Sequence, residues 1–209
     1  MPFYKKIVIN KTTSIFIWKI EEDFNTLFRQ VQLKDVSLAR LESMKSESHQ
    51  NGFLAVRMLL QHIGYSDFDL YYDNFGKPHL KDGKQISISH SCDFSSILIS
   101  STITGIDLEV LKEKIVTIAP RFMDVRHLEG LNNVDKIKKA TVIWGVKESI
   151  FKIKNEKGIS FPQHIFEKEF HLDDNRGIAQ LRFNNIIEEY CFQFEFVENY
   201  ALVCAFQNK

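Results

Sequence analysis

Residues 105–109 read Gly-Ile-Asp-Leu-Glu, an alternating stretch that follows a run of predicted strands and begins the second part of the chain. On a strand, residues two apart face the same side, so Asp107 and Glu109 should project together while Ile106 and Leu108 face the core. Two neighbouring carboxylates repel each other, and a hard cation with oxygen ligands would offset that repulsion. From this spacing alone, a solvated strand with an acidic outer face is the more common explanation.

Upstream of this stretch, the sequence predicts two strands, then helices, then a run of short strands. The strongest helix signal is residues 48–63, with Ser48 as a possible cap and Gly64 just past the end. The other predicted helices are residues 21–31 and 38–45. The predicted strands are residues 6–10, 14–20, 68–72, 86–89, 95–100 and 105–110.

Downstream, the pattern returns to helix and then to strands. Residues 134–154 form the longest predicted helix, and strands are predicted over residues 165–172, 177–183, 189–197 and 200–206. Because helices precede strands twice, the chain is predicted to be an α+β fold with two similar, pseudo-symmetric halves. Each half would pack helices on a small antiparallel sheet, with an N-terminal half over residues 1–105 and a C-terminal half over residues 106–209.

The composition is that of a globular chain with a formal net charge of zero. It has 209 residues, 44% of them hydrophobic, and 18 Phe, enough for a sizeable aromatic core. Lys+Arg and Asp+Glu both total 27, so the basic excess of a nucleic-acid binder is absent. The three cysteines are far apart, which argues against a disulfide framework or a zinc site. No long apolar run is present. We therefore expect a cytoplasmic protein that binds neither nucleic acid nor membrane.

Residues 144–152, WGVKESIFK, supply a second acidic motif. In a helix, Trp144, Glu148 and Lys152 would share one face at spacings of four residues. Glu148 followed by Lys152 is also the ordinary helix-stabilising pair, and a tryptophan here is more often core than ligand contact. The motif by itself does not establish a site.

Two polar motifs lie between the first long helix and residue 105. Residues 86–91, ISISHS, form an alternating strand that ends in a polar cluster around His90, which could donate to a phosphate or serve only structure. Residues 74–78, NFGKP, are a turn that could be plain or could place Lys77 against an anion.

The order of these four motifs, GKP, ISHS, GIDLE and WxxKES, resembles the 4′-phosphopantetheinyl transferase superfamily. The resemblance is to its larger type, which carries two similar halves on one chain, and it covers residues 50–160 by motif. It implies transfer of the 4′-phosphopantetheine group of coenzyme A to a serine of an apo acyl or peptidyl carrier protein. It also implies an active site at the interface of the two halves and a monomer.

Site roles follow from the resemblance, residue by residue. It implies that Asp107, Glu109 and Glu148 bind Mg²⁺, which prefers oxygen ligands. It implies that Glu148 also acts as the base for the carrier serine, and that Lys152 neutralises or protonates the leaving phosphate. It also implies that adenosine 3′,5′-bisphosphate is the product that leaves.

The coenzyme A contacts are implied less completely. His90 and Ser89 match the histidine motif that contacts a phosphate, Lys77 matches the GKP lysine, and Arg57 matches a frequent helix arginine. The alternative for Arg57 is a solvated residue on the helix face. An arginine that many relatives carry before this helix is replaced here by the stretch 48–51, SHQN, and Lys34, Arg40 and Lys45 are the remaining basic candidates.

The segment after residue 110 is a candidate docking surface for an acidic carrier, with an ordinary amphipathic helix as the alternative. Its basic residues are Lys112, Lys114, Arg121 and Arg126, and its apolar residues are Ile115, Ile118, Phe122 and Met123.

Three other functions stay open. One is an inactive relative that binds coenzyme A or a carrier without transfer. Another is a different Mg²⁺-dependent enzyme acting on a nucleotide, although the chain lacks a P-loop motif. The last is a structural module whose cation only stabilises it.

Overall fold

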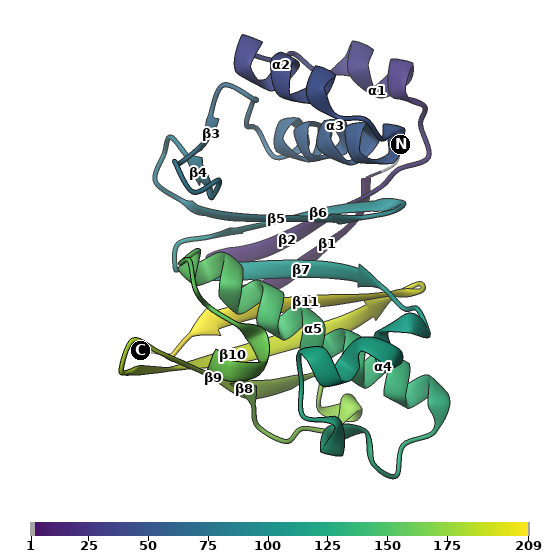
Figure 1. Cartoon of the computed structure of the whole chain (residues 1–209). Helices are drawn as coiled ribbons and strands as arrows, with labels where there is room; N and C mark the ends of the chain where they lie inside the picture. Colours follow the sequence, from purple (N-terminus) through teal and green to yellow (C-terminus); the bar gives the residue numbers. More distant parts are fainter. Residues whose placement is uncertain (1–2, 209) are drawn as a thin grey trace. The chain divides into compact units, whose positions relative to one another are not determined.

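The first of two units, Met1–Thr102, is built on a four-stranded antiparallel sheet in the order β1-β2-β6-β5 (Figure 1). The computed structural model describes residues 3–208. The sheet strands are β1 (Phe3–Asn10), β2 (Thr13–Lys19), β5 (Gln85–Ser91) and β6 (Phe94–Ser100). A separate antiparallel pair joins β3 (Leu70–Tyr72) to β4 (Pro78–Leu80).

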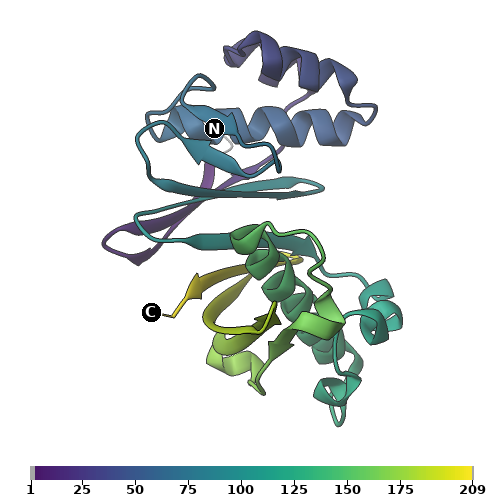
Figure 2. The ribbon, with the colours of Figure 1, turned by 60° about the vertical axis from the view of Figure 1, so that its left-hand side comes forward.

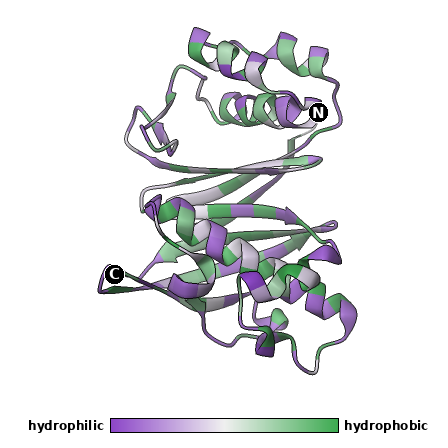
Figure 3. Cartoon of the chain, viewed as in Figure 1, coloured by the Kyte–Doolittle hydropathy of each residue, from purple (hydrophilic) through white to green (hydrophobic). Residues whose placement is uncertain are grey.

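Three helices cover this sheet, and the longest lies between the sheet and the other two (Figures 1 and 2). They are α1 (Phe24–Gln30), α2 (Asp35–Ser43) and α3 (Glu47–His62). Hydrophobic residues recur along α3 (Figure 3). Leu59 and Leu60 pack in the sheet-side core, while Leu54 packs with Leu27 and Leu41 beneath the outer helices. Apolar residues on two sides of α3 thus join three layers.

The predicted start of α3 at residue 48 is one residue late, and the suggested cap at Ser48 is wrong. The residue at the N-cap position is Ser46, with no side-chain cap bond, and Ser48 lies inside the helix. The predicted end is close, because Gly64 follows with φ +87°, a conformation that glycine adopts readily.

The second unit, Ile103–Lys209, holds a five-stranded antiparallel sheet in the order β7-β11-β10-β9-β8. Its strands are β7 (Thr104–Val110), β8 (Ile165–Glu167), β9 (Arg176–Phe183), β10 (Ile186–Val197) and β11 (Tyr200–Gln207). The helix α5 (Asn133–Lys154) packs on β7 and β11. Its shorter helices are α4 (Lys114–Ile118), α6 (Phe161–His164) and the 3₁₀ turns η1 (Ala119–Arg121), η2 (Val125–Leu128) and η3 (Leu172–Asp174).

The bounds of α5 follow from its terminal residues. The Asn132 side chain accepts a hydrogen bond from the backbone N–H of Asp135, and Asn155 ends the helix in the left-handed conformation. Val142, Ile143, Val146 and other buried α5 residues pack against the sheet. Several phenylalanines fill this core, with the Phe170 ring 5.1 Å from Phe192 and 5.7 Å from Phe194. The expected aromatic core is therefore present in this unit.

The predicted α+β class with small antiparallel sheets is confirmed, whereas the pseudo-symmetry of the two halves stays a prediction. The strand predicted over residues 165–172 is wrong over part of its length, because β8 ends at Glu167. Beyond it, Lys168 N–H still donates to Ile178 O at 2.8 Å, and the chain then turns so that Phe170 enters the core.

Across the described part of the chain, no helix is both long and apolar enough to cross a membrane. The three cysteines, which all lie in this part, are free thiols.

Candidate functional site

Two glycines let α5 approach the sheet closely, Gly105 on β7 and Gly145 where the helix faces β11. A Cβ on Gly105 would lie 2.0 Å from the backbone oxygen of Ser149, and a Cβ on Gly145 would lie 2.6 Å from Val203 Cγ2. Such distances are far inside van der Waals contact, so only glycine fits without displacement of the helix. The motif glycines therefore set how near the acidic residues of β7 lie to those of α5.

Asp107 lies in this contact. It is 3% exposed, and the Lys152 ammonium is 2.7 Å from its Oδ1. Lys152 also donates to Ile106 O at 2.9 Å. The Asp107 side of β7 is therefore covered by α5, and the alternative of a solvated acidic strand is excluded for this residue. Ile106 and Leu108 are fully buried, as expected.

Glu109 is the second carboxylate of the strand. Burial, followed by the negative charge of Asp107, raises its pKa to about 7. A hydrogen bond from the Trp144 side chain and the charge of Lys152 oppose this rise, while Glu148 adds to it. Trp144 thus contacts a predicted site residue through its polar group, although its ring also packs edge-on to Phe122 at 5.1 Å.

Glu148, from α5, completes the acidic group. Burial and the charge of Asp107 raise its pKa to about 7, and the charge of Lys152 partly opposes this. The structure thus brings together all four predicted residues of the second unit, Asp107, Glu109, Glu148 and Lys152, in one electrostatically coupled cluster. Three acids with one lysine give a cluster that attracts either protons or a cation.

The donor set of this cluster fits a hard cation. As arranged in residues 3–208, no group of three or more His, Cys, Asp or Glu side chains could hold a metal ion. The chemistry of the residues nevertheless suits Mg²⁺, because all three offer carboxylate oxygens. Burial is the larger cause of the raised pKa values of Glu109 and Glu148, and a divalent charge would relieve the repulsion from Asp107 that adds to it.

Lys77 lies in the turn that connects β3 with β4 in the first unit. Asp73 Oδ1 accepts backbone N–H bonds from Phe75 at 2.8 Å and Lys77 at 3.0 Å, and Asp73 Oδ2 is 3.1 Å from His79 Nε2. Gly76 takes φ +83° within the turn. The turn is therefore ordered around Asp73, and the role of Lys77 toward an anion stays a prediction.

Ser89 and His90 lie near the end of β5. Ser89 is buried, and its backbone oxygen accepts a hydrogen bond from Ser96 Oγ at 3.2 Å. His90 is exposed, and its ring lies edge-on to the His49 ring with centroids 6.0 Å apart. Exposure leaves His90 accessible to a ligand, while the buried position of Ser89 suits support of the strand.

Arg57 lies in a buried ion pair. It is 2% exposed, and its Nε is 3.0 Å from Asp67 Oδ1. Its Nη1 donates to Phe53 O at 3.3 Å, and the guanidinium lies over the Phe53 ring. Asp67 also accepts the Lys34 backbone N–H, at 3.1 Å. The expected solvated alternative does not hold, and a coenzyme A phosphate could reach this guanidinium only by displacing the pair.

Asp67→Ala should lower the free energy of unfolding by about 3–5 kcal/mol, because it leaves the Arg57 charge buried without its partner. Urea unfolding at neutral pH measures this, with the exposed helix residue Glu42→Ala as control. An Asp67→Ala loss no larger than that of the control would show that the pair contributes little to stability.

Lys147 is a residue whose environment the sequence did not reveal. Its ammonium is 2.8 Å from Glu167 Oε2, both side chains are almost fully buried, and Nζ also donates to Ile165 O. Burial lowers the pKa of Lys147 and the charge of Glu167 opposes this. The only sequence signal for this ion pair was a lysine directly before Glu148 in the motif. Its partner, Glu167, lies on β8 and could not be identified from the sequence.

The segment after β7 forms the short helix α4 and the 3₁₀ turns η1 and η2 rather than one long amphipathic helix. Lys112, Lys114 and Arg121 are exposed. Phe122 and Met123 are buried in the core of the unit, so these two apolar side chains are not part of an outer surface.

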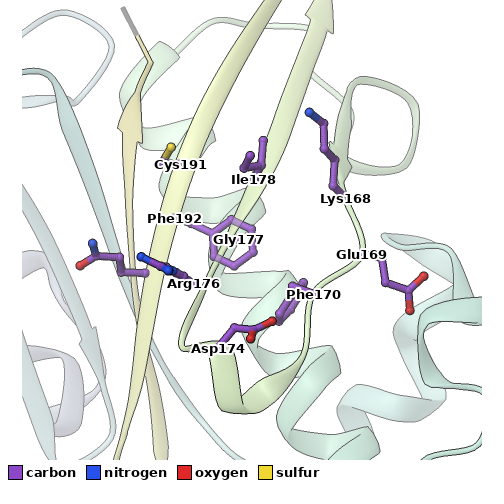
Figure 4. Close-up of a pocket in the computed structure, with 10 residues that line it drawn as sticks. Lys168, Glu169, Phe170, Asp174, Arg176, Gly177, Ile178, Cys191 and Phe192 are labelled. Atoms are coloured by element: carbon purple, nitrogen blue, oxygen red, sulfur yellow. The ribbon is translucent and has the colours of Figure 1, made fainter.

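A pocket of about 560 Å³ lies elsewhere in the second unit, between residues 168–174 and strands β9 and β10 (Figure 4). It is lined by Lys168, Glu169, Phe170, Asp174, Arg176, Gly177, Ile178, Cys191, Phe192 and Gln193. None of these is a predicted site residue. Its charges are of mixed sign, and they favour no particular ligand.

Comparison with known proteins adds one similarity. No protein-family model matches the chain. The 4′-phosphopantetheinyl transferase Sfp of Bacillus subtilis (strain 168) is 29% identical over 144 residues, which is 64% of this chain. The match also spans 64% of the length of that relative. This similarity supports the resemblance that the four motifs indicate.

Proposed function

We propose that this protein transfers the 4′-phosphopantetheine group of coenzyme A to a serine of an apo acyl or peptidyl carrier protein in a Mg²⁺-dependent reaction. The observation that carries the proposal is the cluster of Asp107, Glu109, Glu148 and Lys152, on a chain similar to a 4′-phosphopantetheinyl transferase. Asp107, Glu109 and Glu148 would hold the metal. When bound, Mg²⁺ would neutralise phosphate charge that develops during transfer.

The chain's own groups would then handle the proton and the leaving group. The serine Oγ forms a bond to the phosphorus that carries the pantetheine arm, and the pyrophosphate P–O bond breaks to release adenosine 3′,5′-bisphosphate. Glu148 takes the serine proton as general base. Lys152 would neutralise or protonate the leaving phosphate.

The first unit would supply the coenzyme A contacts, with Lys77 and His90 as the accessible candidates and Ser89 and Arg57 as the buried ones. Ammonium and imidazole groups bind phosphate through charge-assisted hydrogen bonds. We also propose that these residues and the acidic cluster bind the same coenzyme A molecule, and that the protein is a monomer.

Mass spectrometry tests the function directly. The protein is mixed with coenzyme A, Mg²⁺ and several unmodified carrier proteins, and the carrier serine is examined for an added phosphopantetheine. A mass gain on one carrier that requires Mg²⁺ is the expected result. No gain on any carrier would overturn the proposal, and coenzyme A binding without transfer would identify an inactive binding relative.

Mg²⁺ affinity should fall as pH drops below about 7, because Glu109 and Glu148 must lose protons to bind the metal. Titration calorimetry at pH 6.5 in two buffers of different ionisation enthalpy should show proton release on binding. The release should vanish above pH 8, where both groups are already ionised. Proton release that is equal at both pH values would contradict the assignment.

Charge reversal of Lys112 and Lys114 should raise the KM for the carrier about tenfold while leaving the KM for coenzyme A unchanged. These exposed lysines would attract the acidic surface of a carrier during encounter. Steady-state kinetics with each substrate varied in turn measures the effect. Equal changes in both KM values would show that the lysines do not steer the carrier.

A further inference from the structure

We propose that Gly52 is a positioning residue, whose missing Cβ makes the space in which the His90 imidazole lies. This inference rests on the proposed function, because it concerns how a coenzyme A phosphate contact is held. A Cβ at position 52 would lie 2.8 Å from His90 Cδ2, 3.2 Å from Cγ and 3.5 Å from Cβ. The first distance is too short for a carbon–carbon contact, so any larger residue must move the ring or the helix.

The helix is tied in place at this same point. Ser95 is fully buried, and its Oγ donates to Gly52 O at 3.1 Å. Ser95 is also the direct cross-strand partner of His90 in the β5–β6 pairing. One strand pair therefore anchors the backbone of α3 and presents the ring that touches it. A side chain at position 52 should displace the exposed ring rather than the anchored helix.

The imidazole is restricted on a further side. Its Cδ2 and Cγ atoms lie nearest to the position that a Cβ of residue 52 would take. The His49 ring, from the first turn of α3, lies edge-on to it with centroids 6.0 Å apart. Contacts on these sides reduce the rotamers open to His90, and a preordered group loses less entropy when it binds a phosphate.

The identity of residue 52 has no explanation in helix formation. Position 52 lies inside the sixteen-residue helix α3, where glycine is less favourable than alanine because it loses more backbone freedom on folding. Gly52→Ala alone should therefore stabilise the helix, unless the new methyl group collides with His90. This contrast separates a positioning role from a folding role.

A thermal unfolding cycle on the full chain tests the collision without any ligand. Gly52→Ala should raise the unfolding midpoint by about 2 °C in a His90→Ala background, and should leave it unchanged or lower it in the wild type. Ser48→Ala, at an exposed position of the same helix, should act equally in both backgrounds. If Gly52→Ala gives the same shift with and without His90, the inference is wrong.

Coenzyme A binding tests the positioning itself. By titration calorimetry, Gly52→Ala should raise the Kd for coenzyme A about tenfold, and should add nothing further in the His90→Ala background. At saturating coenzyme A the transfer rate should stay within about twofold of wild type. An unchanged Kd in Gly52→Ala, or a loss that persists without His90, would overturn the role.

These outcomes are separable from failure of the proposed function. If wild-type protein neither binds coenzyme A nor modifies a carrier, the proposed function is wrong, and Gly52 then has no ligand contact to position. The unfolding cycle would still decide whether residue 52 makes room for His90.

Discussion

Glu148→Gln is expected to reduce the transfer rate about 10³-fold while making the metal-free protein more stable at pH 8. Activity falls because the amide neither accepts the serine proton nor contributes a full charge to a cation. Stability rises because burial and the charge of Asp107 raise the carboxyl pKa to about 7, so its ionised form is disfavoured in the folded state. The midpoint of thermal unfolding should increase by about 5 °C.

The effect of Glu148 on folding stability should depend on pH with a definite sign. A folded-state pKa above the ordinary value means that the folded protein binds the proton more tightly than the unfolded chain does. The destabilisation by Glu148 is therefore complete above pH 7 and disappears as pH falls toward 4.5. The stability gain of Glu148→Gln should shrink over that window.

The exposed residue Glu129 is the matched control, and Glu129→Gln should change neither the rate nor the pH profile. Differential scanning calorimetry in EDTA from pH 5 to pH 8, with the carrier assay in parallel, gives both measurements. A Glu148→Gln gain that does not vary with pH would contradict the electrostatic explanation. Full activity of this variant would remove Glu148 from the proposed mechanism.

Glu167→Ala should lower the free energy of unfolding by about 3–5 kcal/mol. The Lys147 ammonium lies 2.8 Å from Glu167 Oε2, with both side chains nearly inaccessible to water. His127 Nε2 is 3.7 Å from the other oxygen of the same carboxylate. Removal of the carboxylate leaves a positive charge in a buried site. Urea unfolding at pH 7 measures the loss.

A second ion pair in the same unit provides the control. Lys168 Nζ is also 2.8 Å from Glu189 Oε2, but these two side chains are 51% and 36% exposed. Glu189→Ala should therefore cost far less stability than Glu167→Ala, because water screens this pair. The double variant Lys147→Met/Glu167→Leu should recover most of the stability lost in Glu167→Ala, because no unpaired charge is left. Equal losses at the two pairs would show that burial does not set the size of the effect.

Much of the second unit could be predicted because the signals were local. The apolar spacing of residues 134–154 predicted a helix, and the caps Asn132 and Asn155 place its ends within one residue of that range. Alternation predicted that Asp107 and Glu109 share a side of a strand. The end of β8 could not be predicted, since the turn after Glu167 depends on burial of Phe170 against residues from distant strands.

In the candidate site, too, local signals predicted some features and contacts between distant elements decided the others. Helical spacing put Glu148 and Lys152 on one face, which suggested an ordinary pair between them. In the structure, Lys152 makes an ion pair with Asp107 from β7, and Glu148 takes a raised pKa from its burial beside that strand. Arg57 was expected at a coenzyme A phosphate or in solvent, and its buried partner Asp67 follows a turn after the helix.

By itself, the sequence determined the order of the four polar motifs, the class of the fold and the sides of strand or helix on which the acids lie. Periodicity carries that information, because side-chain direction repeats along each element. Only the tertiary structure decided which acids are buried, which lysine pairs with which carboxylate, and where glycine is required. Those properties arise between elements, since desolvation and charge depend on neighbours that the chain brings from far away. Residues 105–109 predicted a pair of acids, and the packing of α5 over them made that pair a candidate site.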